Sequence, residues 1–227
     1  MARNVTLVTG FEPYGGRGMN PSAEVVKRLD GLEIEGHHVA GRVLPVSFQA
    51  LRARVGPLLD ELEPVLVVSL GLWPGEPTIR LERIAVNVAD FEIPDNDGLV
   101  LRDDVVAAGA GGALLTTLPL RAIEQALLRA GIPARLSTTA GTFLCNATLY
   151  TFLDAEPVRR GVPCGFVHLP YLPEQVAALL EQLLEGGSTE IHQRADLASM
   201  SLTTMVEALR IVLAVSLRQR ALATASR

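Results

Sequence analysis

The chain alternates short, unbroken apolar runs with longer segments in which apolar residues recur at helical spacing. Unbroken runs of Val, Leu and Ile are typical of strands buried on both faces of a sheet, and helical spacing is typical of the helices that cover it. This order predicts an α/β fold with a mostly parallel sheet flanked by helices. We expect strands at 5–9, 65–71, 134–137 and 164–170, one or two more within 34–46, and helices at 22–29, 48–62, 118–130, 173–185 and from 202 towards 222.

Residues 79–88 predict a further strand with an unusual carboxylate. Alternation along this strand places Glu82 on the same face as Ile84, Val86 and Val88. A carboxylate on an apolar face needs a partner, and an imidazole is a suitable one. The alternative is that Glu82 is a surface residue at the start of the strand.

Residues 89–116 show no clear period. A turn is expected at 93–98, which contains Pro, Asp, Asn and Gly, and the run 107–113 consists of alanine and glycine alone. We expect irregular structure here, with 107–113 as a candidate flap over a site.

Cys145 is expected near the first turn of a helix, because small residues at 138–142 lead into a segment with apolar residues on one helical face. Unpaired N–H groups and the positive end of the helix dipole lower the pKa of a thiol there. The same N–H groups are able to hold an oxyanion. The alternative is that Cys145 is a small buried hydrophobe without chemistry.

A glycine-rich loop, residues 10–22, joins the first strand to the first helix. It contains neither Gly-Lys-Ser/Thr nor Gly-x-Gly-x-x-Gly, so it does not match phosphate-binding loops. Phe11 and Tyr14 instead flank a Glu-Pro turn. Aromatic side chains beside the end of a parallel strand suit a flat, small, uncharged group, although both rings would equally serve to pack the loop down.

Length and composition favour one domain. The 227 residues are 48% hydrophobic and contain no obvious linker, so we expect a single domain over 1–227. Aromatic residues make up only 4% of the chain. The core must therefore be built from Val, Leu, Ile and Ala.

Charge and targeting signals exclude several classes of partner. A net charge of −5 with dispersed signs gives no basic stripe for nucleic acid and no patch for a membrane surface. No apolar run reaches the ~18 residues of a spanning helix, and residues 1–4 do not begin a signal peptide, so a cytoplasmic location is expected. There, Cys145 and Cys164 are expected to stay reduced. The histidines, at 37, 38, 168 and 192, lack the paired spacing of a structural zinc site.

Three chemical groups are expected to meet at one edge of the sheet. Glu82, Cys145 and His168 each lie near the end of a predicted strand or the start of a predicted helix, and such ends converge in a mostly parallel sheet. A thiol, an imidazole and a carboxylate supply the nucleophile, base and orienting group of acyl transfer. A single histidine is more often a core residue, so the prediction depends on the three together.

Several motifs occur in the order found in one known family. The matching stretches are 8–16 (Val-Thr-Gly-Phe-Glu-Pro-Tyr-Gly-Gly), 20–22, 82–87 (Glu-Arg-Ile-Ala-Val-Asn), 93–96, 139–146 (Thr-Ala-Gly-Thr-Phe-Leu-Cys-Asn), 166–175 and 199–202. Over nearly its whole length the chain resembles pyroglutamyl peptidase I, also called pyrrolidone-carboxylate peptidase, a family of cysteine peptidases. The resemblance implies a three-layer α/β/α sandwich around a mostly parallel, mixed sheet, assembly as a homodimer or homotetramer, and no metal or organic cofactor.

The resemblance also implies a reaction, the removal of N-terminal pyroglutamate from peptides. Cys145 would attack the pyroglutamyl carbonyl to form a thioester, His168 would move the protons, and Glu82 would orient the imidazole. Four side chains would surround the flat lactam ring: Phe11, Tyr14, Ile93 and Phe143.

The chain departs from the family at the expected substrate pocket. Where the family has Gly-Gln-Ala-Gly-Gly-Arg, residues 71–76 are Gly-Leu-Trp-Pro-Gly-Glu, and Glu92 stands in place of another arginine. Leu72 thus replaces a glutamine that hydrogen-bonds the lactam, which lowers discrimination by about 1–3 kcal/mol. Backbone amides of 71–77, a water or Asn20 would have to supply the missing hydrogen bonds. Glu76 and Glu92 in place of two arginines are also expected to change the electrostatic field of the substrate pocket.

Two other functions remain open at this point. One is a cysteine amidohydrolase that keeps the three groups but prefers another small acyl group. The other is a non-catalytic relative retained for binding. The presence of all three chemical groups disfavours the non-catalytic relative, and the exopeptidase is the first interpretation.

Overall fold

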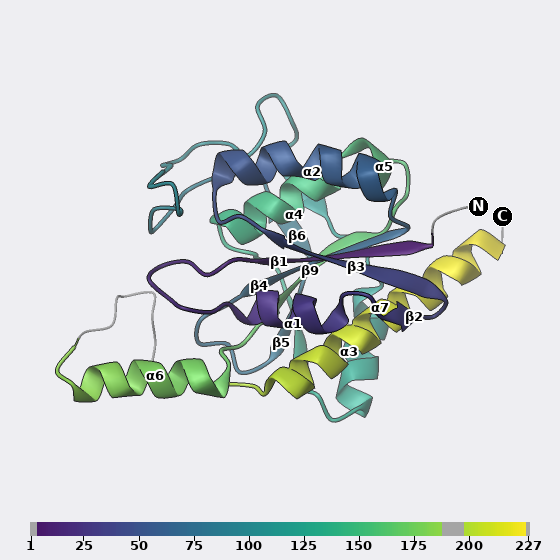
Figure 1. The fold of residues 1–227 in the computed structure, drawn as a ribbon. Coiled ribbons are helices and arrows are strands. Elements are labelled where there is room, and N and C mark those ends of the chain that lie inside the picture. Colours follow the sequence, from purple (N-terminus) through teal and green to yellow (C-terminus); the bar gives the residue numbers. More distant parts are fainter. Residues whose placement is uncertain (1–3, 188–197, 226–227) are drawn as a thin grey trace.

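The computed structural model describes residues 4–187 and 198–225 (Figure 1). His192 and residues 1–3, which belong to the N-terminal stretch searched for a signal peptide, lie outside the described residues. The strands are β1 (Val5–Phe11), β2 (Glu33–Ile34), β3 (His37–Leu44), β4 (Leu66–Leu72), β5 (Ile79–Glu82), β6 (Ile84–Val86), β7 (Ala113–Leu115), β8 (Ala134–Ser137) and β9 (Cys164–Leu169). The helices are α1 (Pro21–Leu29), α2 (Phe48–Leu62), α3 (Leu120–Arg129), α4 (Leu144–Asp154), α5 (Glu156–Arg159), α6 (Pro173–Leu184) and α7 (Leu202–Ala225).

The central sheet is mixed but mostly parallel, as predicted. Its strand order is β2-β3-β1-β4-β9-β5-β8. Strands β3, β1, β4 and β9 run in one direction, whereas β2, β5 and β8 run in the other. The carboxyl ends of β5 and β8 therefore point away from those of β4 and β9. The expectation that the relevant ends all converge on one edge is wrong for these two strands.

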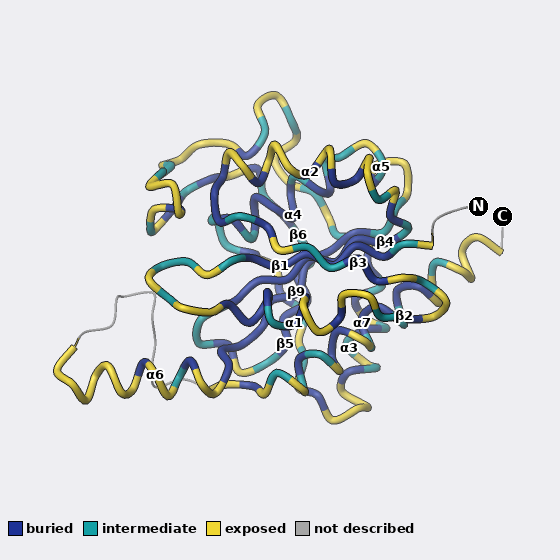
Figure 2. Tube along the Cα trace, in the orientation of Figure 1, coloured by how far each residue is buried: buried dark blue, intermediate teal, exposed yellow. Residues whose placement is uncertain are grey.

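Helices cover both faces of the sheet, and the predicted three-layer architecture is confirmed. One apolar cluster joins the sheet to α1, α3 and α7, and a second joins it to α2 and α4 (Figure 1). Alternation along β1 sends Leu7 into the second cluster and Val8 into the first. Figure 2 shows the central strands β1, β4 and β9 among the most buried parts of the chain.

The segment 79–88 is two strands in different sheets, so the prediction of one continuous strand is wrong. β5 ends at Glu82, and β6 pairs antiparallel with β7 in a separate two-stranded sheet. The neighbouring strand β8 ends at Ser137, whose carbonyl accepts the Arg83 N–H at 2.9 Å. Beyond that bond β8 no longer runs beside the chain, and the Cys164 carbonyl of β9 accepts from the Thr117 N–H and the Thr116 hydroxyl instead, so the chain leaves the central sheet.

The segment 89–116 contains β7, which was not predicted, and the expected flap is packed down. The Asn87 side chain bonds both backbone groups of Ala107 at 2.8 Å, and the Tyr150 hydroxyl donates to the Gly111 carbonyl. These bonds hold 107–113 against the α4 layer.

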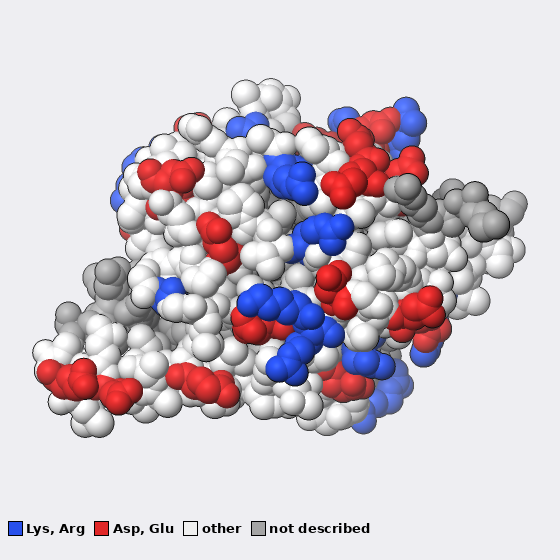
Figure 3. All heavy atoms as spheres, viewed as in Figure 1, with Lys and Arg blue, Asp and Glu red and all other residues white. Residues whose placement is uncertain are grey.

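No helix within residues 4–187 and 198–225 combines the length and hydropathy needed to cross a membrane. Figure 3 shows acidic and basic side chains interspersed over the visible face, in keeping with a sequence in which both signs are dispersed.

Candidate active site

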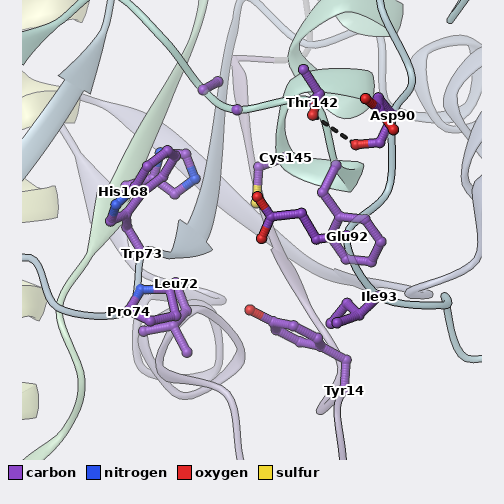
Figure 4. A pocket seen from close by; sticks show the side chains of 13 residues that line it. Tyr14, Leu72, Trp73, Pro74, Asp90, Glu92, Ile93, Thr142, Cys145 and His168 are labelled. Atoms are coloured by element: carbon purple, nitrogen blue, oxygen red, sulfur yellow. Dashed lines mark hydrogen bonds between the residues drawn. The ribbon is translucent and has the colours of Figure 1, made fainter. Parts of the chain in front are cut away.

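A cavity of about 310 Å³ opens where β4 and β9 end and α4 begins (Figure 4). Its volume lies at the small end of the range for clefts that bind small molecules. The lining residues are Tyr14, Leu72, Trp73, Pro74, Asp90, Glu92, Ile93, Ala140, Gly141, Thr142, Phe143, Cys145 and His168. The run 107–113 contributes none of them.

Cys145 is the second residue of α4 and is half-buried, at the helix start predicted from the sequence. Phe143 is the N-cap of α4, and its side chain offers no hydrogen-bond acceptor to the N–H groups of the first turn. The Asn146 side chain bonds both the N–H and the carbonyl of Val86, at 2.9 and 2.8 Å, and so fixes this turn against β6. The helix start thus presents a thiol beside uncapped backbone donors.

Gly71 makes the room that the thiol occupies. A Cβ atom on Gly71 would lie 2.7 Å from Cys145 Sγ and 2.9 Å from Cζ of Phe166. Both distances are well below carbon–sulfur and carbon–carbon contact distances. Any side chain at this position would therefore displace the sulfur or the Phe166 ring.

His168 is held by a buried carboxylate on the neighbouring strand. The antiparallel register places Arg80 opposite His168, and alternation puts Glu82 on the same face of β5 as Arg80. Nδ1 of His168 lies 2.8 Å from Oε1 of Glu82, which also accepts from Nε of Arg80 at 3.0 Å. With Nδ1–H donating to Glu82, Nε2 of the neutral ring is left as an acceptor.

Arg80 ties this carboxylate to the turn that leads to Cys145. Its guanidinium donates to Ser137 Oγ at 2.6 Å and to the Thr139 carbonyl at 2.8 Å. It also lies 3.8 Å from the centre of the Trp73 ring, and Trp73 meets the His168 ring edge-on at 4.9 Å. No role was predicted for Arg80 or Trp73, although a tryptophan just after the strand expected at 65–71 was a usable signal.

Burial and hydrogen bonding have opposite effects on the pKa values of His168 and Glu82. Burial lowers the pKa of His168, although the bond to Glu82 opposes this, so the imidazole is neutral near pH 7. Burial alone raises the pKa of Glu82, but its hydrogen bond with His168 and the positive charge of Arg80 oppose burial and hold that pKa below its ordinary value. The carboxylate is therefore ionised beside a neutral ring.

The expected lowering of the Cys145 pKa is wrong for this structure. Burial, followed by the negative charge of Glu82, raises the pKa of the thiol to about 12, and the stabilising backbone N–H of Cys145 does not compensate. The resting pair is therefore a neutral thiol and a neutral imidazole. The thiol needs a base at the moment it attacks.

Glu76 does not face the cavity, so it does not change the electrostatic field there in the way expected from the sequence. Its side chain is buried outside the cavity, where it accepts two hydrogen bonds from Arg135, at 2.9 and 2.5 Å, and one from Thr78 at 2.6 Å. It also pairs with Arg80 at 3.4 Å. The carboxylate is thus used to hold the arginine that braces Glu82.

Four of the six predicted substrate-binding residues line the cavity: Tyr14, Leu72, Ile93 and Phe143. Phe11 does not, because its ring is buried in the core on the α2 and α4 side of the sheet. Asn20 does not either, because it is the N-cap of α1, accepting from Ser22 N–H and donating to the Glu12 carbonyl. The expectation that Phe11 and Asn20 face the substrate is corrected accordingly.

Both cysteines are free thiols, and Cys164 is buried in β9 away from the cavity lining. Among the residues that the structure describes, no group of three or more His, Cys, Asp or Glu side chains is placed to hold a metal ion.

Comparison with known proteins agrees with the motifs. The sequence profile of the pyroglutamyl peptidase family matches residues 4–219. Pyrrolidone-carboxylate peptidase from Enterobacter sp. is 41% identical over 213 residues, covering 94% of this chain and 92% of the relative. The Pyrococcus furiosus enzyme of the same name is 44% identical over 172 residues, covering 75% and 82%.

Solved structures give the same result. A mutant pyrrolidone carboxyl peptidase from Pyrococcus furiosus superposes with a TM-score of 0.85 at 37% identity, covering 95% of this chain and 99% of the other. Pyrrolidone carboxyl peptidase from Thermococcus litoralis gives 0.84 at 37% identity, with 94% and 93% covered. The resemblance predicted from the motifs is confirmed, and the chain belongs to the pyroglutamyl peptidase family.

Proposed function

We propose that this protein is a cysteine exopeptidase that removes N-terminal pyroglutamate from peptides through a thioester. The observation that carries the proposal is a neutral His168, oriented by an ionised and buried Glu82, in the same small cavity as the helix-start thiol of Cys145. Family membership supplies the substrate class.

In the acylation step, Cys145 Sγ attacks the carbonyl carbon that joins pyroglutamate to the next residue. The thiol proton passes to Nε2 of His168, whose positive charge Glu82 stabilises. Uncapped N–H groups at the start of α4 receive the negative charge on the carbonyl oxygen.

The remaining steps use the same groups. When the C–N bond breaks, His168 returns its proton to the leaving amine, and the pyroglutamyl group stays on sulfur. His168 then takes a proton from water, which attacks the thioester and releases pyroglutamate and the thiol. The Glu82 bond keeps a proton on Nδ1 throughout, so every transferred proton arrives at and leaves from Nε2.

Recognition of the lactam ring falls to Tyr14 in this proposal. Figure 4 shows the Tyr14 hydroxyl pointing into the cavity, opposite the apolar side chain of Leu72. Burial raises the pKa of Tyr14 to about 12, so the hydroxyl remains a donor at neutral pH. Of the other donors considered from the sequence, Asn20 caps α1, and the backbone N–H groups of Trp73 and Glu76 donate to the carbonyls of Leu169 and Trp73 at 2.9 and 3.2 Å. We assign the ring oxygen to the Tyr14 hydroxyl and the ring faces to Ile93 and Phe143.

Two further features belong to the proposal. A cytoplasmic location would keep the Cys145 thiol reduced, as the reaction requires. Assembly as a homodimer or homotetramer follows from the family resemblance, and sedimentation of the purified chain would measure it.

The test is hydrolysis of a fluorogenic pyroglutamyl amide beside the matching prolyl amide, which lacks the ring carbonyl. We expect release of the fluorophore from the pyroglutamyl amide, and none with Cys145→Ala. Tyr14→Phe should raise KM for the pyroglutamyl amide more than it lowers kcat, because it removes a ground-state hydrogen bond. Turnover that survives Cys145→Ala would overturn the assignment.

A further inference from the structure

The proposed cavity contains a carboxylate that the reaction does not use. Glu92 is exposed and lines the cavity next to Ile93. Figure 4 shows its carboxylate directed across the opening, from the side of Ile93 towards the side of His168. A substrate bound at Cys145 would therefore lie beside this charge.

Glu92 has no ion-pair partner among residues 4–187 and 198–225, and no lysine or arginine lines the cavity. The second acidic residue of the lining, Asp90, differs in this respect because Arg102 lies 3.4 Å away. The nearby Arg17 stacks on the Tyr14 ring at 4.8 Å and lines a neighbouring cavity, and its buried guanidinium likewise has no ion-pair partner among the described residues. Glu92 is thus the one acidic side chain of the cavity lining that has no ion pair with a described residue.

The pyroglutamyl group cannot form an ion pair with Glu92, because its lactam is neutral. With the scissile carbonyl at Cys145 and the ring inside the cavity, the residue that follows pyroglutamate leaves through the opening that Glu92 borders. We propose that Glu92 makes this enzyme select pyroglutamyl peptides whose next residue is lysine or arginine and discriminate against those with aspartate or glutamate there. This inference rests on the proposed function and names its substrate class.

Coulomb's law sets the expected size of the effect. A unit charge about 6 Å from Glu92 in water-like surroundings changes affinity by roughly three-fold, in one direction for a cation and in the other for an anion. The ratio of kcat/KM between a lysyl and a glutamyl peptide should therefore be about 10 at low salt. It should fall towards about 2 near 0.5 M salt, where the screening length is only a few ångströms.

The kinetic experiment compares pyroglutamyl-Lys-Ala amide, pyroglutamyl-Ala-Ala amide and pyroglutamyl-Glu-Ala amide. The native enzyme should rank them in that order, Glu92→Gln should reduce the lysyl-to-glutamyl ratio to about 1, and Glu92→Lys should invert it. Asp90→Asn should change the ratio less, because Arg102 already offsets that charge. Glu181→Gln is the matched control, since Glu181 is exposed on α6 and does not line the cavity.

Trp73 gives a readout that does not depend on turnover, because it is the one tryptophan of the chain and lines the cavity. Quenching of its fluorescence by the three peptides should give dissociation constants in the same order, with the order abolished by Glu92→Gln. Equal constants and equal kcat/KM for the three peptides, or a ratio unchanged by Glu92→Gln, would overturn the inference while hydrolysis of the alanyl peptide still upheld the proposed function. Ordered binding without hydrolysis of any peptide would uphold the selectivity of Glu92 and overturn the proposed function.

Discussion

Replacement of Gly71 by alanine tests whether the position of the Cys145 sulfur matters for the reaction. The added Cβ would stand 2.7 Å from Sγ, about 1 Å inside a normal contact. The backbone of Gly71 needs no positive φ, so the perturbation is steric. A misplacement of about 1 Å at a reacting atom costs on the order of 10²-fold in rate. We expect kcat/KM to fall by about that factor.

The same methyl group would press on the Phe166 ring at 2.9 Å, so overpacking should also lower the free energy of unfolding, by about 1–3 kcal/mol. Activity is therefore to be measured well below the melting temperature of the variant, together with the rate of alkylation by iodoacetamide. Both rates should change, because the thiol itself is displaced.

Two other glycines separate displacement of the thiol from loss of stability. A Cβ on Gly165 would lie 2.4 Å from Leu118 Cδ1 but meets no atom of the cavity, so Gly165→Ala should destabilise the fold and leave kcat/KM in the folded fraction near the native value. Gly56, in α2, has nothing within 4 Å, and Gly56→Ala should leave activity unchanged and add about 0.5–1 kcal/mol of stability. Full activity and a native alkylation rate in Gly71→Ala would refute the reasoning.

Three further predictions concern the ionisation of Glu82, His168 and Cys145 and the apolar side chain of Leu72. Glu82→Gln should lower kcat by about 10²–10⁴-fold with a native circular dichroism spectrum, because it removes the charge that stabilises His168 when protonated; an unchanged kcat would assign Glu82 to structure alone. The pH profile of kcat/KM should have its acid limb below 6.5, where burial places the pKa of His168, and its basic limb above 9, where burial places the pKa of Cys145. Alkylation of Cys145 by iodoacetamide that stays fast down to about pH 4 would show a resting thiolate and contradict the neutral pair. Leu72→Gln should improve kcat/KM for pyroglutamyl over prolyl amides by the value of one hydrogen bond, about 0.5–1.5 kcal/mol, because the bond from Tyr14 leaves the second lone pair of the ring oxygen open. Unimproved selectivity would show that a second donor adds nothing to the bond from Tyr14.

Most of the fold was predictable because its signals are local. Apolar runs and helical periods located β1, β4, β9 and the main helices, and the glycine-containing turn before Cys145 located the start of α4. The direction of β5 was not predictable in the same way. It depends on pairing with β9, in which Glu82 lies opposite Phe166, a residue more than 80 positions further along the chain. A single sequence carries no local signal for such pairing.

The site was predictable as a set of chemical groups, but the surroundings that tune them were not. The carboxylate of Glu76 bonds Arg135, which lies 59 residues further along the chain, so its departure from the family pattern looked like a change in the substrate pocket. Asn20 looked available for the lactam because its role as a helix cap also requires an amide. The raised pKa of Cys145 depends on burial beside the Phe166 ring and Gly71, which only the packed structure supplies.

The measurement that tests the central claim most directly is the intact mass of the enzyme, acid-quenched during turnover of a pyroglutamyl amide. The account predicts a species heavier by one pyroglutamyl group, mapped by proteolysis to the peptide that contains Cys145 and absent from Cys145→Ala. It also predicts that Cys164→Ser accumulates the same adduct, because Cys164 lies outside the cavity lining. An adduct on Cys164, or continued turnover by Cys145→Ala, would contradict it.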